Sequence, residues 1–162
     1  MEGPGRKPSK KLDGYIRKEA SAITNISPRT IQYYTDRGFV IPEVDPATGR
    51  GKTRRYSRKN LVELYFIKEL SAHGYTLEKI ERIMKKVSKD LDEFWDKSND
   101  IPTATDLFLQ LKEPRTRDVE VKLLRMKDIH LDELITSYGF RNFSVIGLEG
   151  IILSILKAAN GT

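Results

Sequence analysis

The sequence feature that most constrains the fold is a stretch whose apolar side chains leave no face of a helix free. Ser57 is a good N-cap residue, and Gly74 is a good residue to end the helix that follows. Between them the apolar residues point in nearly every direction of a helix; they are Leu61, Val62, Leu64, Tyr65, Phe66, Ile67 and Leu70. A helix that is apolar all round must be enclosed by other elements. We therefore expect residues 58–73 to form the hub of a small domain.

A helix-turn-helix pattern precedes this hub. A short helix is expected over residues 15–22, followed by a brief connection. Ser27 suits an N-cap, and Pro28 suits the first helical position, where its missing N–H removes no intrahelical bond. The second helix is expected over residues 28–37, because Gly38 favours a helix end.

A short basic ribbon is expected after the second helix. Residues 39–44 and 52–56 favour extended backbone, and the Asp-, Pro- and Gly-containing residues 45–51 favour a turn between them. Five cations lie within nine residues here: Arg50, Lys52, Arg54, Arg55 and Arg58. Like charges at this density repel one another unless a polyanion neutralises them. A ribbon that grips nucleic acid is the favoured interpretation, and a merely solvated loop is the alternative.

The charge of the 162-residue chain is unevenly distributed. The net charge is +6, with 14 Lys and Arg against 6 Asp and Glu in residues 1–60, and 15 against 17 in the remainder. A basic half suits nucleic acid, whose phosphates supply most non-specific affinity. Solubility alone would also explain the charge, so the local pattern has to decide. Residues 1–13 are rich in Gly, Pro and Lys and are expected to form a disordered basic tail.

The helix expected over residues 28–37 presents a polar face that suits a DNA groove. Ile31, Tyr34 and Thr35 cluster on one side and can pack inward. The opposite side and its flanks carry Arg29, Thr30, Gln32, Tyr33, Asp36 and Arg37. Arg can bind guanine, Gln can bind adenine, Thr can touch a thymine methyl group, and Tyr can reach a phosphate. A surface helix of mixed polarity is the alternative, and the neighbouring basic ribbon favours DNA.

These segments, taken in order, resemble the winged helix-turn-helix DNA-binding domain of the MerR family of transcription regulators. The resemblance rests on residues 26–34 (ISPRTIQYY), 37–42 (RGFVIP), 54–57 (RRYS), 66–70 (FIKEL) and 74–80 (GYTLEKI), and it covers about residues 14–87. It implies that the helix over residues 28–37 enters the major groove while the ribbon, or wing, contacts phosphates. The candidate DNA-binding residues are Arg17, Lys18, Ser27, Arg29, Thr30, Gln32, Tyr33, Arg37, Lys52, Arg54 and Arg55. The family usually has Arg at the position of Gln32, so a phosphate contact is missing here or replaced by a base-directed hydrogen bond.

The resemblance further implies a homodimer that binds promoter DNA and distorts it for RNA polymerase. The expected function is therefore sequence-specific regulation of transcription, with double-stranded DNA, a second copy of the chain and RNA polymerase as partners. An architectural DNA-binding protein, excisionase-like or chromosome-anchoring and with no direct role in transcription, is the first alternative. An adaptor whose basic wing meets an acidic protein is the second.

A heptad pattern begins in the last part of the winged domain and continues beyond it. The apolar residues are separated alternately by three and four positions; they are Leu77, Ile80, Met84, Val87, Leu91 and Phe94. This seam predicts either a dimerisation helix or ordinary amphipathic packing. Residues 88–101 are expected to form a helical linker or dimerisation segment.

The last third of the chain mixes two periodicities. Alternation predicts a hairpin of strands over residues 106–111 and 119–124, and helical spacing predicts helices over residues 131–138 and 148–159. The expected fold class is mainly α with small β content. A MerR-like winged domain occupies residues 14–87, and a small α or α+β domain for dimerisation or effector binding occupies residues 102–162.

Composition excludes several classes of function. The chain has no Cys, which excludes disulfides, thiolate metal centres and thiol redox sensing. His73 and His130 are too few and too far apart to predict a metal site. No nucleophile–base arrangement, Gly-rich phosphate loop or paired carboxylates with catalytic spacing stand out, so neither an enzyme nor a cofactor is expected. No apolar run approaches the roughly 20 residues that span a bilayer, so no membrane partner is expected and the default location is cytoplasmic.

Overall fold

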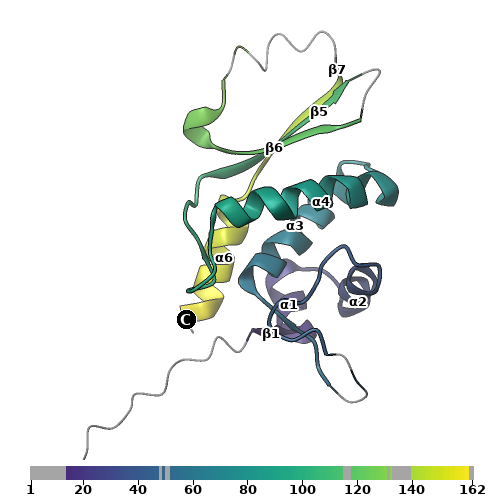
Figure 1. Ribbon diagram of the computed structural model, residues 1–162, viewed down its shortest axis with the longest axis vertical. Coiled ribbons are helices and arrows are strands. Elements are labelled where there is room, and N and C mark those ends of the chain that lie inside the picture. Colours follow the sequence, from purple (N-terminus) through teal and green to yellow (C-terminus); the bar gives the residue numbers. More distant parts are fainter. Residues whose placement is uncertain are drawn as a thin grey trace, which may run out of the picture.

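The computed structural model describes residues 14–47, 49, 52–114, 118–130, 132 and 140–160. Helix α3 (Arg58–Ala72) runs through its middle and is the hub expected from the sequence (Figure 1). Ser57 and Asn60 cap its start reciprocally, each side chain accepting the backbone N–H of the other residue at 3.0 Å. Its fully buried apolar side chains are Leu61, Val62, Leu64, Phe66, Ile67 and Leu70. The prediction of a helix enclosed on several sides is confirmed.

The two helices of the helix-turn-helix pack against one another beside α3. Helix α1 (Arg17–Thr24) is followed by α2 (Pro28–Asp36), and the Ser27 hydroxyl accepts the backbone N–H of Thr30 at 3.1 Å. Arg37 caps the end of α2, and Gly38 follows with a positive φ of 74°, a conformation that costs glycine little. The local start and stop signals of α2 are therefore confirmed.

The segment before α1 is a strand, and the expected helix start at residue 15 is wrong. Strand β1 (Tyr15–Ile16) pairs antiparallel with β2 (Arg55–Tyr56), so its backbone bonds the wing instead of continuing the helix. Gly14 precedes β1 with a φ of 56°, and a Cβ there would lie 2.9 Å from the Val44 side chain. Helix α1 can begin only after this pairing ends.

The wing has less strand than its sequence suggested. Residues 39–44 form no strand, and of residues 52–56 only Arg55 and Tyr56 do. In the described part of the wing, one bridge between Asp45 and Arg55 joins the two arms. Pro42 accounts for part of the difference, because it lacks the N–H that a ladder needs. The expected turn lies partly outside the described residues, since Thr48, Arg50 and Gly51 are not among them.

The heptad seam lies on α4 (Leu77–Glu93) and is buried within the chain. Ile80, Met84, Val87 and Leu91 are at most 2% exposed, and α4 lies against α3 on one side and β6 on another. Leu77, at the start of the seam, is 42% exposed. Of the two interpretations of the pattern, amphipathic packing is therefore the one that the structure shows. A partner helix cannot occupy this seam unless the chain first opens.

The helix expected to extend through residue 101 ends earlier. Phe94 follows the last turn of α4, and β3 (Trp95–Asp96) then pairs with β4 (Ile101–Pro102) in a small hairpin. Asp100, at a positive φ of 52°, accepts the indole N–H of Trp95 at 3.0 Å and the backbone N–H of Arg58 at 2.8 Å. The hairpin turn therefore bonds the start of the hub helix, which a continuous α4 could not do.

A three-stranded antiparallel sheet covers the far side of α4. Its strands are β5 (Leu107–Pro114), β6 (Glu120–Arg125) and β7 (Phe140–Gly147), in the order β6-β5-β7. The predicted hairpin is confirmed, with Leu109 opposite Leu123 and Leu111 opposite Val121 on the buried face. Strand β7 was not predicted. The short 3-10 helix η1 (Met126–Asp128) follows β6, and the helix expected over residues 131–138 lies outside the described residues apart from Asp132.

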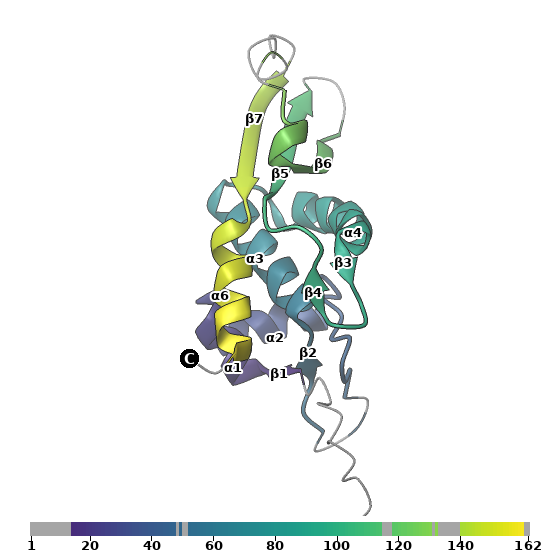
Figure 2. The same cartoon turned by 90° about the vertical axis from the view of Figure 1, so that its left-hand side faces the viewer.

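The last helix returns to the N-terminal half. Helix α6 (Glu149–Asn160) confirms the predicted helix over residues 148–159, and it lies against α3 and α1 while the sheet stands at the opposite end of the molecule from the wing (Figure 2). Buried side chains of both halves form one cluster. Of the described helices, none has the length and apolar character needed to cross a membrane.

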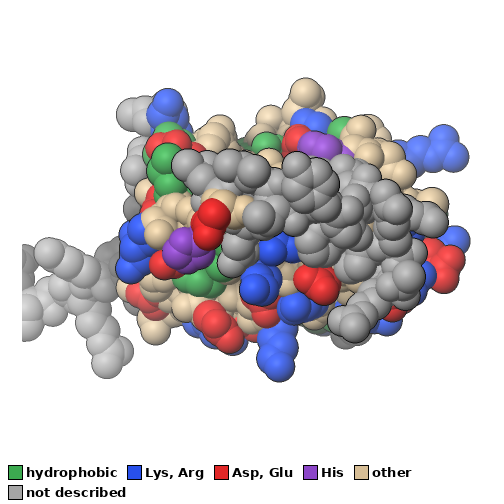
Figure 3. Space-filling view, turned by 90° about the horizontal axis from the view of Figure 1, so that it is seen from above, with side chains coloured by type: hydrophobic (Ala, Val, Ile, Leu, Met, Phe, Trp, Pro, Cys, Tyr) green, Lys and Arg blue, Asp and Glu red, His purple; other side chains and the backbone are tan. Residues whose placement is uncertain are grey.

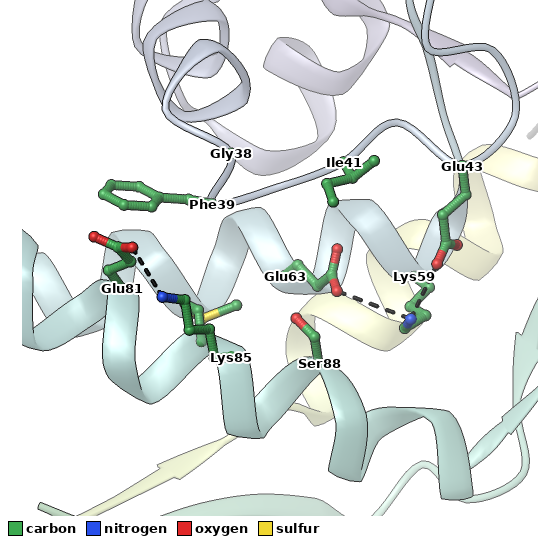
Figure 4. A pocket seen from close by; sticks show the side chains of 10 residues that line it. Gly38, Phe39, Ile41, Glu43, Lys59, Glu63, Glu81, Lys85 and Ser88 are labelled. Carbon is green, nitrogen blue, oxygen red and sulfur yellow. Dashed lines mark hydrogen bonds and ion pairs between the residues drawn. The ribbon is translucent and has the colours of Figure 1, made fainter.

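A buried ammonium group joins three parts of this arrangement. Lys59 of α3 is 5% exposed, and its Nζ lies 3.0 Å from Glu43 Oε1 and 2.9 Å from Asp92 Oδ1 of α4. Glu63 Oε1 lies 3.9 Å from the same nitrogen, and Glu43, Lys59 and Glu63 line a cavity of about 380 Å³ (Figure 4). Burial raises the pKa of Glu63, although Asn60 donates to its carboxylate at 2.9 Å. Lys59 thus holds the segment after α2, the hub and α4 together.

Replacing Lys59 by Met is expected to lower the free energy of unfolding by about 3 kcal/mol at neutral pH, because it leaves the Glu63 carboxylate buried without a cation. The loss should shrink as the pH falls towards the raised pKa of Glu63. Protonation of a group whose folded pKa is raised favours the folded state, and that stability is lost as the pH rises. Urea unfolding followed by circular dichroism at neutral and mildly acidic pH measures both effects.

The matched control is Lys85→Met, which removes an exposed ion pair with Glu81 on α4. Its loss should stay below about 1 kcal/mol. Equal losses for the two variants would contradict a structural role for the buried cluster.

Candidate nucleic-acid interface

Helix α2 divides into a buried side and an exposed side. Ile31 and Tyr34 are buried in the hydrophobic core, and burial raises the pKa of the Tyr34 phenol, with Tyr33 contributing further. The Tyr34 phenol is therefore neutral near pH 7. The exposed side chains of α2 and its C-cap are Pro28, Arg29, Gln32, Tyr33, Asp36 and Arg37. The arrangement agrees with the helical-face prediction, with Thr30 half-buried at the edge.

A groove of about 650 Å³ lies between the start of α1, α2 and the wing. It brings together five of the predicted site residues from three segments: Arg17, Lys18, Gln32, Lys52 and Arg54. Four of these five are cations. A surface that gathers cations from separate segments attracts phosphates, and its concave shape can follow a DNA strand.

The other predicted residues do not line this groove. Ser27 is the N-cap of α2, and its hydroxyl is 2.7 Å from that of Thr30, so its role in the free protein is to hold the helix start. Arg29 is exposed in the first turn of α2. The guanidinium of Arg37 lies over the Tyr33 ring, 5.5 Å from its centroid, and the two side chains support one another. Arg55 belongs to β2.

Two contacts join the wing to α2, and the half-buried one fixes their relative position. The Tyr56 hydroxyl lies 2.9 Å from that of Thr35, and the buried Tyr56 ring fixes this bond in place. Arg54 donates to Asp36 Oδ1 at 2.6 Å. The wing and the exposed face of α2 therefore keep a defined relative position, which two surfaces that grip one duplex require.

Gln32 is oriented by its neighbour in α1. Arg17 donates from Nη1 to Gln32 Oε1, and a guanidinium can only donate, so the amide oxygen faces Arg17 and the amide hydrogens face away. A two-point contact with adenine needs both the amide oxygen and the amide hydrogens. The adenine contact expected for Gln32 would therefore require the amide oxygen to leave Arg17 or to accept from Arg17 and adenine together. While the bond to Arg17 lasts, one of the two lone pairs of this oxygen is occupied.

Sequence reasoning did not count Asp36 and Tyr56 among the site residues. Asp36 lies four residues after Gln32 on α2, and helical periodicity did place it on the exposed face. Its pairing with the wing joins residues 18 positions apart and leaves no signal in local sequence. The hydroxyl bond between Tyr56 and Thr35 is likewise non-local, because it joins residues 21 positions apart.

Among the described residues, those at the end of the molecule opposite the wing show no comparable concentration of cations. On the described part of the face seen from above the sheet, Lys and Arg side chains lie interspersed with Asp and Glu (Figure 3). In the described residues there is also no group of three or more His, Asp or Glu side chains that could hold a metal ion. The basic groove beside α2 is therefore the principal candidate site.

A helix-turn-helix with a basic wing behind its second helix defines a class of DNA-binding proteins. The family model described as MerR HTH family regulatory protein matches residues 15–87 of the chain. Uncharacterized HTH-type transcriptional regulators from Mycobacterium bovis and from two strains of Mycobacterium tuberculosis are each 33% identical to the chain over 69 residues.

The similarity is confined to part of each protein. The aligned residues make up 43% of this chain and 31% of each relative, so the chain matches about a third of their length. The residues matched by the family model contain α1, α2, the wing and α3, and most of α4. The sheet and α6 lie beyond them.

Replacing Arg54 and Arg55 together by Ala is expected to weaken binding to every duplex, because each removed cation forfeits the release of counterions from a phosphate. The slope of log affinity against log salt should become shallower by about one for each phosphate that is no longer neutralised. Fluorescence anisotropy with a random-sequence duplex measures both quantities.

The double variant of Lys85 and Lys89, two exposed lysines of α4, removes the same charge away from the groove. It should leave the slope nearly unchanged. An unchanged affinity for the wing variant would remove the wing from the interface.

Proposed function

We propose that the protein is a sequence-specific transcription regulator that binds promoter DNA as a dimer and distorts it. The observation that carries this proposal is the groove in which cations of α1 and the wing meet the exposed face of α2. An α-helix with its side chains is about 10–12 Å across, which suits the roughly 12 Å width of the major groove. The match of residues 15–87 to the MerR family model supports the same function.

The two parts of the surface have different tasks in this proposal. Arg29, Thr30 and Tyr33 lie towards the start and middle of α2 and would contact base edges or nearby phosphates. The groove cations would bind the sugar-phosphate backbone and fix the register of α2. No catalytic step and no cofactor belong to the proposed function.

A dimer has to form through surfaces other than the seam of α4. That seam is filled by the chain's own α3 and β6. Large apolar side chains that remain exposed outside the seam include Met126, Val145 and Leu153. Leu77, at the start of the seam, is exposed as well. A second copy is proposed because one α2 reads only a few base pairs, whereas two copies read both halves of a symmetric site. RNA polymerase is the further partner that regulation of a promoter requires.

Selection of bound sequences from a random duplex pool tests the proposal. A regulator that binds as a dimer should enrich one sequence with two related half-sites at a fixed spacing. Footprinting of the enriched site on genomic DNA then separates the alternatives. Protection between promoter elements supports regulation, whereas repeated protection away from promoters would indicate an architectural protein. A pool without enrichment would contradict sequence-specific binding.

Replacing Arg29 by Ala is expected to weaken binding to the selected site by about 1–3 kcal/mol and to relax its sequence preference, because a bidentate bond to guanine would be removed. Titration of the variant against the selected site and against base-substituted sites measures the change. An equal loss on random DNA would instead make Arg29 a phosphate contact.

A further inference from the structure

The surface proposed to face DNA contains a carboxylate. Asp36 is the last residue of α2, its side chain is 49% exposed, and it lines the same groove as Arg17, Lys18, Lys52 and Arg54. A carboxylate in this position meets the phosphates of a bound duplex with like charge. It therefore opposes the function of the cations around it.

The local structure of α2 does not account for this residue. A negative charge at the C-terminal end of a helix interacts unfavourably with the helix dipole, so Asp36 does not stabilise the helix by its position. Its carboxylate binds Arg54 at 2.6 Å, and the Arg54 side chain is 37% exposed. An ion pair so open to water adds little to folding stability. The reason for the carboxylate has to be sought in what it does to Arg54.

The carboxylate and a DNA phosphate are competitors for the same guanidinium. Both are anionic oxygen acceptors, and an arginine fork binds either. Arg54 of the wing can reach a phosphate only by releasing Asp36 or by sharing its donors between two anions. In either case the charge of Asp36 remains near the phosphate and weakens the contact.

We propose that Asp36 occupies Arg54 as a substitute for a phosphate and so lowers the affinity for arbitrary DNA. The inference rests on the proposed function. Non-specific binding consists almost wholly of phosphate contacts, so a competitor for one of them weakens it directly. Binding to the selected site also includes base contacts from α2, which Asp36 leaves intact.

The test is Asp36→Asn, which keeps the shape of the side chain and removes its charge. Binding to a random-sequence duplex is measured by fluorescence anisotropy over a range of salt concentrations. Affinity should rise by about two- to fivefold, and the salt slope should steepen by about one as Arg54 gains a full phosphate contact. The control Glu120→Gln removes an exposed carboxylate from β6, far from the groove, and should leave the slope unchanged.

The same substitution is repeated in an Arg54→Ala background. If Asp36 acts through Arg54, the slope should no longer steepen there and the gain in affinity should shrink. Equal gains in both backgrounds would show general repulsion and overturn the proposal. A loss of affinity for random DNA in Asp36→Asn would overturn it too, because it would make Asp36 a DNA contact.

The outcomes separate this proposal from the function beneath it. If wild-type protein binds random duplex with a salt-dependent affinity and Asp36→Asn binds no more tightly, the role of Asp36 is refuted. The proposed function is not refuted by that result. Wild-type protein that binds no duplex refutes both. Circular dichroism of each variant confirms that the helices are intact.

Discussion

The enclosure of α3 is the constraint on which the rest of the structure depends. Its apolar side chains point in nearly every direction, so α1, α4 and α6 must cover it from different sides. The heptad seam of α4 is therefore buried inside the chain, and the C-terminal helix α6 packs against the N-terminal half. Lys59 adds a polar interaction, because its ammonium group forms ion pairs with Glu43 in the segment after α2 and with Asp92 of α4.

Enclosure of the hub also positions the surface proposed to meet DNA. Ile31 and Tyr34 fix one side of α2 against the core, and Tyr56 fixes the base of the wing. The hydroxyl bond between Tyr56 and Thr35 and the ion pair between Arg54 and Asp36 then join wing and helix. The first is half-buried and tied to the core, whereas the second is exposed and can open when a phosphate competes.

Local signals in the sequence were sufficient for α2, α3 and α6 and insufficient for pairings between distant residues. Ser27 and Gly38 delimit α2 because caps act within a few residues, and alternation around Leu109 identified the β5–β6 hairpin. The pairing of β1 with β2, the position of β7 and the contact between Asp36 and Arg54 join residues far apart in the chain. The heptad seam was ambiguous for another reason, since burial within the chain and burial against a partner impose the same periodicity.

The central claim is that α2 and the wing together recognise duplex DNA and not merely negative charge. Competition with heparin, a polyanion without grooves or bases, tests this most directly. If the claim holds, the duplex selected from a random pool stays bound at heparin concentrations that displace random duplexes, across a range of salt concentrations. Displacement of the selected and random duplexes at the same heparin concentration, under every salt condition, would contradict it.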